Sequence, residues 1–132
     1  QLVALVYSPP GCLRVLDPDL DPLNQMLPLL IRQAAGLSQV DLIQQDSTQA
    51  AIPMPGIFGD EPQHGWCYYF ENADLAWQYK DYQKIIDLYN ESEKNGFSST
   101  IGTEYYPFVD AFARLGNMKK AVASTSGGSF PQ

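Results

Sequence analysis

The feature that most constrains the fold is a helical pattern of apolar residues that occurs twice in the second half of the chain. Its first occurrence covers residues 66–89, and a break at Lys80-Asp81 divides it into two stripes. Apolar residues spaced by three or four positions mark one face of a helix, so the pattern predicts two antiparallel helices joined by a short turn. Gly96 is expected to end the second helix in the left-handed conformation that closes many helices.

The same pattern starts again after a short connector. A third stripe begins at Tyr105 and ends before a Gly116-Asn117 turn, and a short fourth helical segment follows. An offset of 36 residues places Tyr69 on Tyr105 and Asp81 on Asn117. Self-similarity at such a period indicates a helical repeat. The second unit is expected to lose its last helix near residues 124–128, so the array holds fewer than two full units.

This half of the chain resembles the tetratricopeptide family, whose unit of ~34 residues carries a Gly-Asp/Asn-Tyr turn and small residues where its helices touch. Asp81-Tyr82 and Leu115-Gly116-Asn117 match that turn. Small residues occupy three of the family's small positions: Ala73, Ser92 and Ala121. Three residues depart from the family pattern: Lys80, Ile85 and Phe97. The resemblance implies tetratricopeptide-like helix pairs over residues 65–125, in an array too short for a long concave groove.

The first half of the chain predicts a small β element and one long helix. Residues 2–7 and 12–16 are strand-like runs on either side of a proline-rich turn, so they are expected to form a hairpin. The helix is expected to start at Asp21-Pro22 and to stop at Gly36. Pro28 lies inside this pattern, so the helix must kink there or begin only a few residues before it.

The remaining residues of the first half, 44–63, have no helical or strand period and are interpreted as a linker. The predicted fold class is mainly α (α+β). Residues 1–63 would form the N-terminal hairpin, helix and linker, and residues 64–132 the helical repeats, all within one compact unit. No apolar run approaches the ~20 residues that span a bilayer. Because the chain begins at Gln1 without a methionine, we expect it to be a piece or a matured product of a larger protein.

The charge of the chain bounds its partners. Fifteen acidic residues against eight basic ones give a formal net charge of -7. Such a charge argues against nucleic acid and against an anionic membrane surface as the partner. No Gly-rich phosphate loop, nucleophile elbow or Cys-x-x-Cys pair occurs, so no cofactor is expected.

Two cysteines, Cys12 and Cys67, are too few to form a metal cage, and no metal site is expected. They could form one disulfide or remain two buried thiols, and the residues alone leave both open. His64 is the only histidine, so a Cys-His or Ser-His-Asp centre would have to be built around it. We interpret it as a structural or surface histidine, whereas a small hydrolase around His64 and Cys67 would predict a reactive thiol.

Two groups of carboxylates have ordinary structural explanations. Residues 17–21 alternate aspartates as a calcium loop does, but Pro22 takes the place of the required glycine, so we interpret Asp21 as a helix cap. Glu71 and Asp74 lie one helical turn apart and could form an acid–base pair. A solvated helix face is the preferred interpretation.

Aromatic residues crowd the first repeat, and they cannot all point inward from one pair of helices. The rings that could instead form an exposed platform for carbohydrate or peptide are Trp66, Tyr69, Trp77 and Tyr79. Packing against the N-terminal half would account for these rings equally well.

The strings at residues 10–17 and 64–76 resemble the soluble C-terminal region of bacterial multi-span membrane proteins related to lipid-linked-sugar glycosyltransferases. The resemblance implies an extracytoplasmic domain that follows membrane helices, with any glycosyltransferase activity in the rest of the protein. It also favours a bond between Cys12 and Cys67. We therefore expect a non-catalytic interaction or structural module whose partner is a protein or the rest of its own membrane chain. The alternative is an accessory carbohydrate-binding domain.

Overall fold

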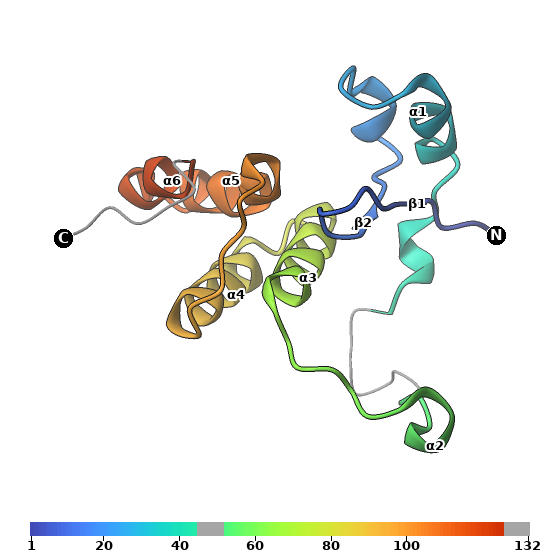
Figure 1. Cartoon of the computed structure of the whole chain (residues 1–132). Coiled ribbons are helices and arrows are strands. Elements are labelled where there is room, and N and C mark those ends of the chain that lie inside the picture. The colour runs from blue at the N-terminus through green and yellow to red at the C-terminus, as the bar shows by residue number, and fades with distance from the viewer. Residues whose placement is uncertain (45–51, 126–132) are drawn as a thin grey trace. The chain divides into compact units, whose positions relative to one another are not determined.

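The computed structural model describes residues 1–44 and 52–125 (Figure 1). These residues are mainly helical, with a small two-stranded antiparallel sheet near the N-terminus, which confirms the predicted fold class. None of the described helices has both the length and the apolar character needed to cross a bilayer. Part of the expected linker, residues 45–51, and the end of the expected second repeat, residues 126–132, lie outside the described residues.

The chain divides into two compact units at positions that differ from the expected boundary. The first unit comprises Gln1–Leu5 and Leu16–His64, and the second comprises Val6–Val15 and Gly65–Gln132. The expected boundary keeps all of residues 1–63 together. Residues 6–15 instead belong with the C-terminal helices, because their main-chain groups and one cysteine contact those helices directly.

The strands are shorter than predicted. Strand β1, Leu5–Val6, pairs with strand β2, Arg14–Val15, and one further bond runs from the Leu16 amide to the Ala4 carbonyl. The ladder stops there because side chains take the next main-chain donors. The amide of Ala4 donates to Ser38 Oγ, and the amide of Cys12 donates to Glu104 Oε1.

The first unit consists of short elements around a small core. Its elements are η1 (Asp21–Leu23), α1 (Leu29–Ala35), η2 (Val40–Leu42) and α2 (Pro55–Phe58). The buried apolar side chains are Ala4, Leu16 and Ala35. Asp21 is also buried, and its Oδ2 accepts a hydrogen bond of 2.8 Å from the Asp17 amide. Its carboxylate therefore organises the turn before η1.

The single long helix expected from Asp21 is divided into η1 and α1. Helix α1 has seven residues and begins directly after Pro28, whose backbone is extended at φ -55 and ψ 148. A proline has no amide hydrogen, and its ring clashes with the preceding helical turn. The residue before a proline also avoids the helical conformation. Pro28 thus acts as the start of the helix and not as a kink within it.

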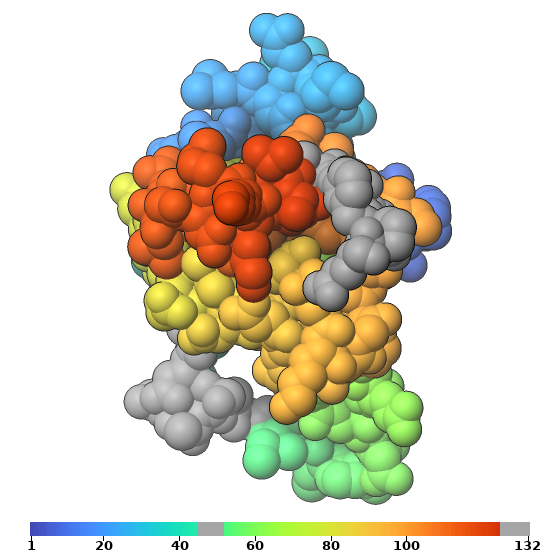
Figure 2. All heavy atoms as spheres, turned by 90° about the vertical axis from the view of Figure 1, so that its left-hand side faces the viewer, coloured from blue at the N-terminus to red at the C-terminus, as the bar shows by residue number. Residues whose placement is uncertain are grey.

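The second unit contains two consecutive helix pairs. The first pair is α3 (Trp66–Gln78) and α4 (Tyr82–Lys94). After η3 (Gly102–Tyr105), the second pair is α5 (Tyr106–Arg114) and α6 (Met118–Thr125). In Figure 2, α4, α5 and α6 are seen packed together as yellow, orange and red atoms.

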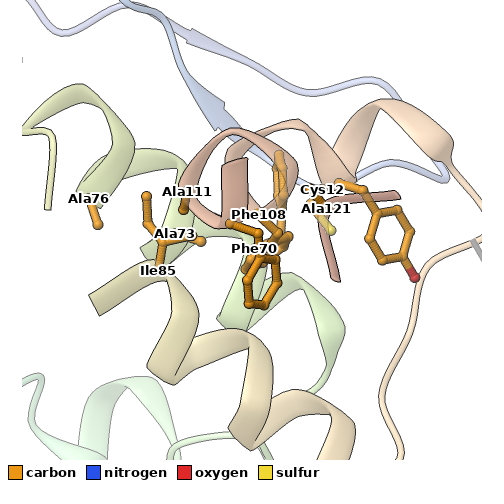
Figure 3. Close-up of a cluster of buried hydrophobic side chains, with 10 residues drawn as sticks. Cys12, Phe70, Ala73, Ala76, Ile85, Phe108, Ala111 and Ala121 are labelled. Atoms are coloured by element: carbon orange, nitrogen blue, oxygen red, sulfur yellow. The ribbon is translucent and has the colours of Figure 1, made fainter. Parts of the chain in front are cut away.

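Aromatic and small side chains share the core of the second unit. Phe70 of α3, Ile85 of α4, and Phe108 and Phe112 of α5 are each at most 1% exposed. Alanines stand between them and allow the helix backbones to approach closely (Figure 3). These alanines are Ala73, Ala76, Ala111 and Ala121. The apolar stripes of the sequence therefore correspond to the faces that the helices bury.

The turns within the two pairs are equivalent at the predicted offset of 36 residues. Lys80 and Gly116 both adopt positive φ, at 59° and 80°. In each turn the next amide donates back to the preceding helix, from Asp81 to the Ala76 carbonyl and from Asn117 to the Phe112 carbonyl. The side chains of Asp81 and Asn117 then cap the following helix by accepting from the amides of Lys84 and Lys120. This is the hydrogen-bond pattern of a Schellman turn followed by an N-cap.

Candidate functional site

The richest set of polar contacts in the second unit joins residues 12–15 to one face of α3. Helix positions 67, 71, 74 and 78 lie above one another because they are spaced by four, three and four residues. Each contacts a successive residue of the extended segment: Cys67 contacts Cys12, Glu71 contacts Leu13, Asp74 contacts Arg14, and Gln78 contacts Val15. We call this set the α3 ladder.

The first contact of the α3 ladder is a disulfide between Cys12 and Cys67. Their Cα atoms lie 5.2 Å apart, and the bond closes a loop across a sequence separation of 55 residues. Neither cysteine is a thiol, so a Cys-His centre has no nucleophile here. The geometry is that of a covalent anchor for the extended segment.

The two carboxylates of the α3 ladder are not on a solvated face, so that interpretation is wrong. Asp74 is 2% exposed and lies 3.7 Å from the guanidinium of Arg14. Glu71 is half-buried, and its Oε1 accepts a bond of 3.2 Å from the Leu13 amide. Burial raises the pKa of Glu71, the bond from Leu13 lowers it, and the charge of Glu104 raises it further, with a net increase. The two groups bind the segment, and they are not arranged as an acid–base pair.

The last contact of the α3 ladder, made by Gln78, is with a main-chain group only. The side-chain amide of Gln78 donates a hydrogen bond of 2.7 Å to the carbonyl oxygen of Val15. Together with the bond from the Leu13 amide to Glu71, it fixes the segment through groups that every residue carries. The α3 ladder therefore holds an extended backbone.

Glu104 extends these contacts into the core. Its Oε1 accepts from the Cys12 amide at 2.8 Å, and its Oε2 accepts from the Trp66 indole at 2.7 Å and from the Ser99 hydroxyl. Glu104 is 5% exposed. A buried carboxylate needs such donors to remain favourable. Glu104 thus connects the disulfide-bonded segment, the start of α3 and the connector before η3.

The four rings predicted to bind a ligand do not share one exposed surface. Trp66 packs against Tyr105 at a ring distance of 4.9 Å, and its N–H is bound by Glu104. Tyr69 is 2% exposed. These two rings are parts of the packed interior of the second unit.

Trp77 and Tyr79 lie near the C-terminal end of α3, away from Trp66 and Tyr69. The Trp77 indole donates to Asp110 Oδ2 at 2.8 Å, and Arg114 donates to the same oxygen. Tyr79 is 36% exposed at the end of α3. Of the four predicted rings, Tyr79 is thus the exposed one, Tyr69 is buried, and Trp66 and Trp77 are partly buried.

His64 and a metal site are the remaining candidates for chemistry. His64 is exposed, and its Nε2 lies 2.8 Å from Glu61 Oε1. No group of three or more histidine, cysteine or acidic side chains suited to a metal ion is found in residues 1–44 and 52–125. The interpretation of His64 as a surface residue agrees with its position.

Reasoning from hydrophobic spacing missed the α3 ladder because three of its four helix residues are polar. A pattern based on apolar residues assigns such positions to solvent. The available signal was the helical spacing of Glu71, Asp74 and Gln78 in line with Cys67. Their partner segment was only partly predictable: Cys12 was a candidate partner of Cys67, whereas Glu71 and Gln78 bind main-chain groups that leave no trace in the sequence.

No family model matches the chain, and neither a curated protein nor a solved structure is significantly similar to it. The α3 ladder and the surroundings of Glu104 are therefore the basis for a functional proposal.

Proposed function

We propose that this chain is a non-catalytic interaction or structural module, and that it forms an extracytoplasmic domain of a larger membrane protein. The observation that carries the proposal is the use made of the reactive side chains. Cys67, Glu71 and Glu104 are a cysteine and two carboxylates, side chains that nucleophilic and acid–base catalysis commonly use. All three hold the segment that contains Cys12 and Leu13.

The disulfide supports the extracytoplasmic location in this proposal. Disulfides form and persist in extracellular and periplasmic spaces, and they are rare where glutathione and thioredoxin keep thiols reduced. The Cys12–Cys67 bond lies at the centre of the contacts that attach residues 6–15 to the helices. A domain with this dependence fits the extracytoplasmic side of a membrane.

The two helix pairs support the role in interaction. Their equivalent turns at Lys80 and Gly116 are what a tetratricopeptide-like repeat would have. Families of this kind present helix surfaces to partners instead of enclosing a reaction centre. The partner would be another protein or the rest of the membrane chain.

Thiol trapping in intact cells tests the compartment. The full-length protein, with any further cysteine replaced, is quenched in acid and treated with a maleimide polymer before and after reduction. We expect no mass shift before reduction and two additions after it. A Cys12→Ser variant is the control, since its single Cys67 should react without reduction. Two reactive thiols in the unreduced wild-type protein would contradict the proposal.

Crosslinking in the same cells tests the interaction. A photoreactive residue at Tyr79 or Tyr106, which are exposed, should join the module to another protein or to a distant part of its own chain. Absence of any such product from both positions would argue against an interaction module.

The carbohydrate alternative predicts a saturable change in tryptophan fluorescence at millimolar glycan. We expect none, because both indole N–H groups are bound within the second unit.

A further inference from the structure

We propose that residues 20–32 of the first unit, here called the tip, are a membrane-docking surface that inserts between phospholipid headgroups. This inference concerns a different unit from the α3 ladder. It goes beyond the function proposed above and does not depend on it.

The tip exposes an unusual number of large aliphatic side chains. Met26 is 91% exposed, Leu23 is 77% and Leu30 is 76%. Leu20 and Leu29 are exposed as well. All of these lie within residues 20–30, where η1 and α1 pack against each other. Soluble proteins rarely leave such a group of apolar side chains in water unless the group binds something.

The charge of the tip differs from that of the rest of the chain. No aspartate or glutamate occurs between Asp21 and Asp41, although the chain has 15 acidic residues. Arg32 is the only lysine or arginine in the whole first unit. The tip therefore combines exposed aliphatic side chains with the positive charge of Arg32, while its one carboxylate, Asp21, is buried.

Within residues 1–44 and 52–125, Arg32 forms no ion pair. Its Nε is buried without a hydrogen-bond acceptor among the same residues. A guanidinium is well suited to a phosphate, which it can bind through two parallel hydrogen bonds. Arginines beside apolar surface also extend their charged end toward the headgroup region of a membrane.

A phospholipid surface matches these features better than a second copy of the chain. A symmetric dimer through the tip would bring two Arg32 side chains toward the same interface, and between Asp21 and Asp41 it would offer no carboxylate to pair with them. A membrane offers phosphates to Arg32 and accepts aliphatic side chains in any arrangement. Lipid headgroups therefore supply both kinds of contact that the tip lacks.

The net charge of -7 determines which lipid headgroups the chain should prefer. The carboxylates outside the tip repel an anionic surface, so zwitterionic phosphatidylcholine vesicles should bind the chain at low salt. Phosphatidylglycerol vesicles should bind less under those conditions. Their binding should increase with salt, because ions screen the repulsion over about 10 Å at 0.1 M.

Flotation of the 132-residue chain with vesicles of each lipid tests the proposal. We expect the chain to float with phosphatidylcholine vesicles, and the Leu23→Ser/Met26→Ser/Leu30→Ser variant to partition at least about tenfold less, because it loses three aliphatic side chains. Arg32→Gln should weaken binding, and Arg32→Lys should restore part of it. Circular dichroism confirms that each variant is folded.

A matched control removes three exposed apolar side chains from the second unit, as Tyr106→Ser/Leu115→Ser/Met118→Ser. This variant should float like the wild type. An equal loss in the control, or no flotation of the wild type with either lipid, would overturn the proposal. So would analytical ultracentrifugation showing a dimer that the tip variant dissociates, since a second copy would then be the occupant.

Discussion

Lys80 adopts a backbone conformation that lysine normally avoids. Its φ is 59°, and the equivalent residue of the second helix pair is Gly116, with φ 80°. In the left-handed region the Cβ atom of an ordinary residue crowds the following carbonyl, whereas glycine has no such atom. The two turns therefore have the same shape at different conformational cost.

This comparison gives a pair of opposite predictions. Lys80→Gly should stabilise the second unit by about 1 kcal/mol, and Gly116→Ala should destabilise it by about 1 kcal/mol. A Cβ at Gly116 would meet no atom within 4 Å, so the cost there comes from the backbone alone. Urea denaturation followed by tryptophan fluorescence measures both changes. Shifts of the same sign for the two variants would contradict the equivalence of the turns.

Helix α3 is the element on which the second unit is built, because it buries two faces. Phe70, Ala73 and Trp77 on one face pack in or against the core. The residues on the other face make the contacts of the α3 ladder. The first face is apolar and contacts α4 and α5. The second is polar and binds the extended segment, which accounts for the buried position of Asp74.

The polar face makes stability depend on pH through Glu71. Its pKa is raised above 4.5 in the folded state, so the folded chain retains this proton to higher pH than the unfolded chain does. The stability associated with protonated Glu71 is fully present below about pH 4.5, and it declines as the pH rises through the folded pKa. Glu71→Gln can still accept from the Leu13 amide and does not ionise.

We therefore expect Glu71→Gln to gain stability relative to the wild type as the pH rises above about 4.5, until Glu71 is fully ionised. Urea midpoints of both proteins from about pH 4 to about pH 8 measure this difference. Asp87→Asn, at an exposed carboxylate of α4, serves as the control and should show no comparable trend. A difference that stays constant or reverses over this range would contradict the role given to Glu71.

How much could be predicted from the sequence differs between these two faces. The apolar stripe through Phe70 and Trp77 identifies α3 and its buried side, because hydrophobic burial follows helical spacing. The division of the expected long helix at Pro28 was less predictable, since one proline permits either a kink or a start. Of the α3 ladder, the bond between Cys12 and Cys67 was one of two possibilities that the sequence left open. The contacts of Glu71 and Gln78 could not be predicted, because a polar stripe is ordinarily solvated and these two side chains bind main-chain atoms.

At the scale of the whole molecule, the disulfide determines how firmly the segment is held. Closing a loop with a sequence separation of 55 residues restricts the unfolded chain, which corresponds to about 4 kcal/mol of stability. The Cys12→Ser/Cys67→Ser variant should lose about this amount. Both tryptophans of the chain, Trp66 and Trp77, lie in the second unit, so their fluorescence in urea reports its unfolding. A loss below about 1 kcal/mol would mean that the α3 ladder holds the segment without the bond.

The path of the chain between the two units determines which fragments of the protein keep the contacts of the second unit. Residues 6–15 belong to the second unit, although the rest of that unit begins at Gly65. A fragment that starts at Gly65 would therefore leave Glu71 and Glu104 without the amides that they bind. Conversely, a protease that cuts once near Gly59 would leave two pieces joined through Cys12 and Cys67. They would migrate as one species on a gel until a reductant separates them.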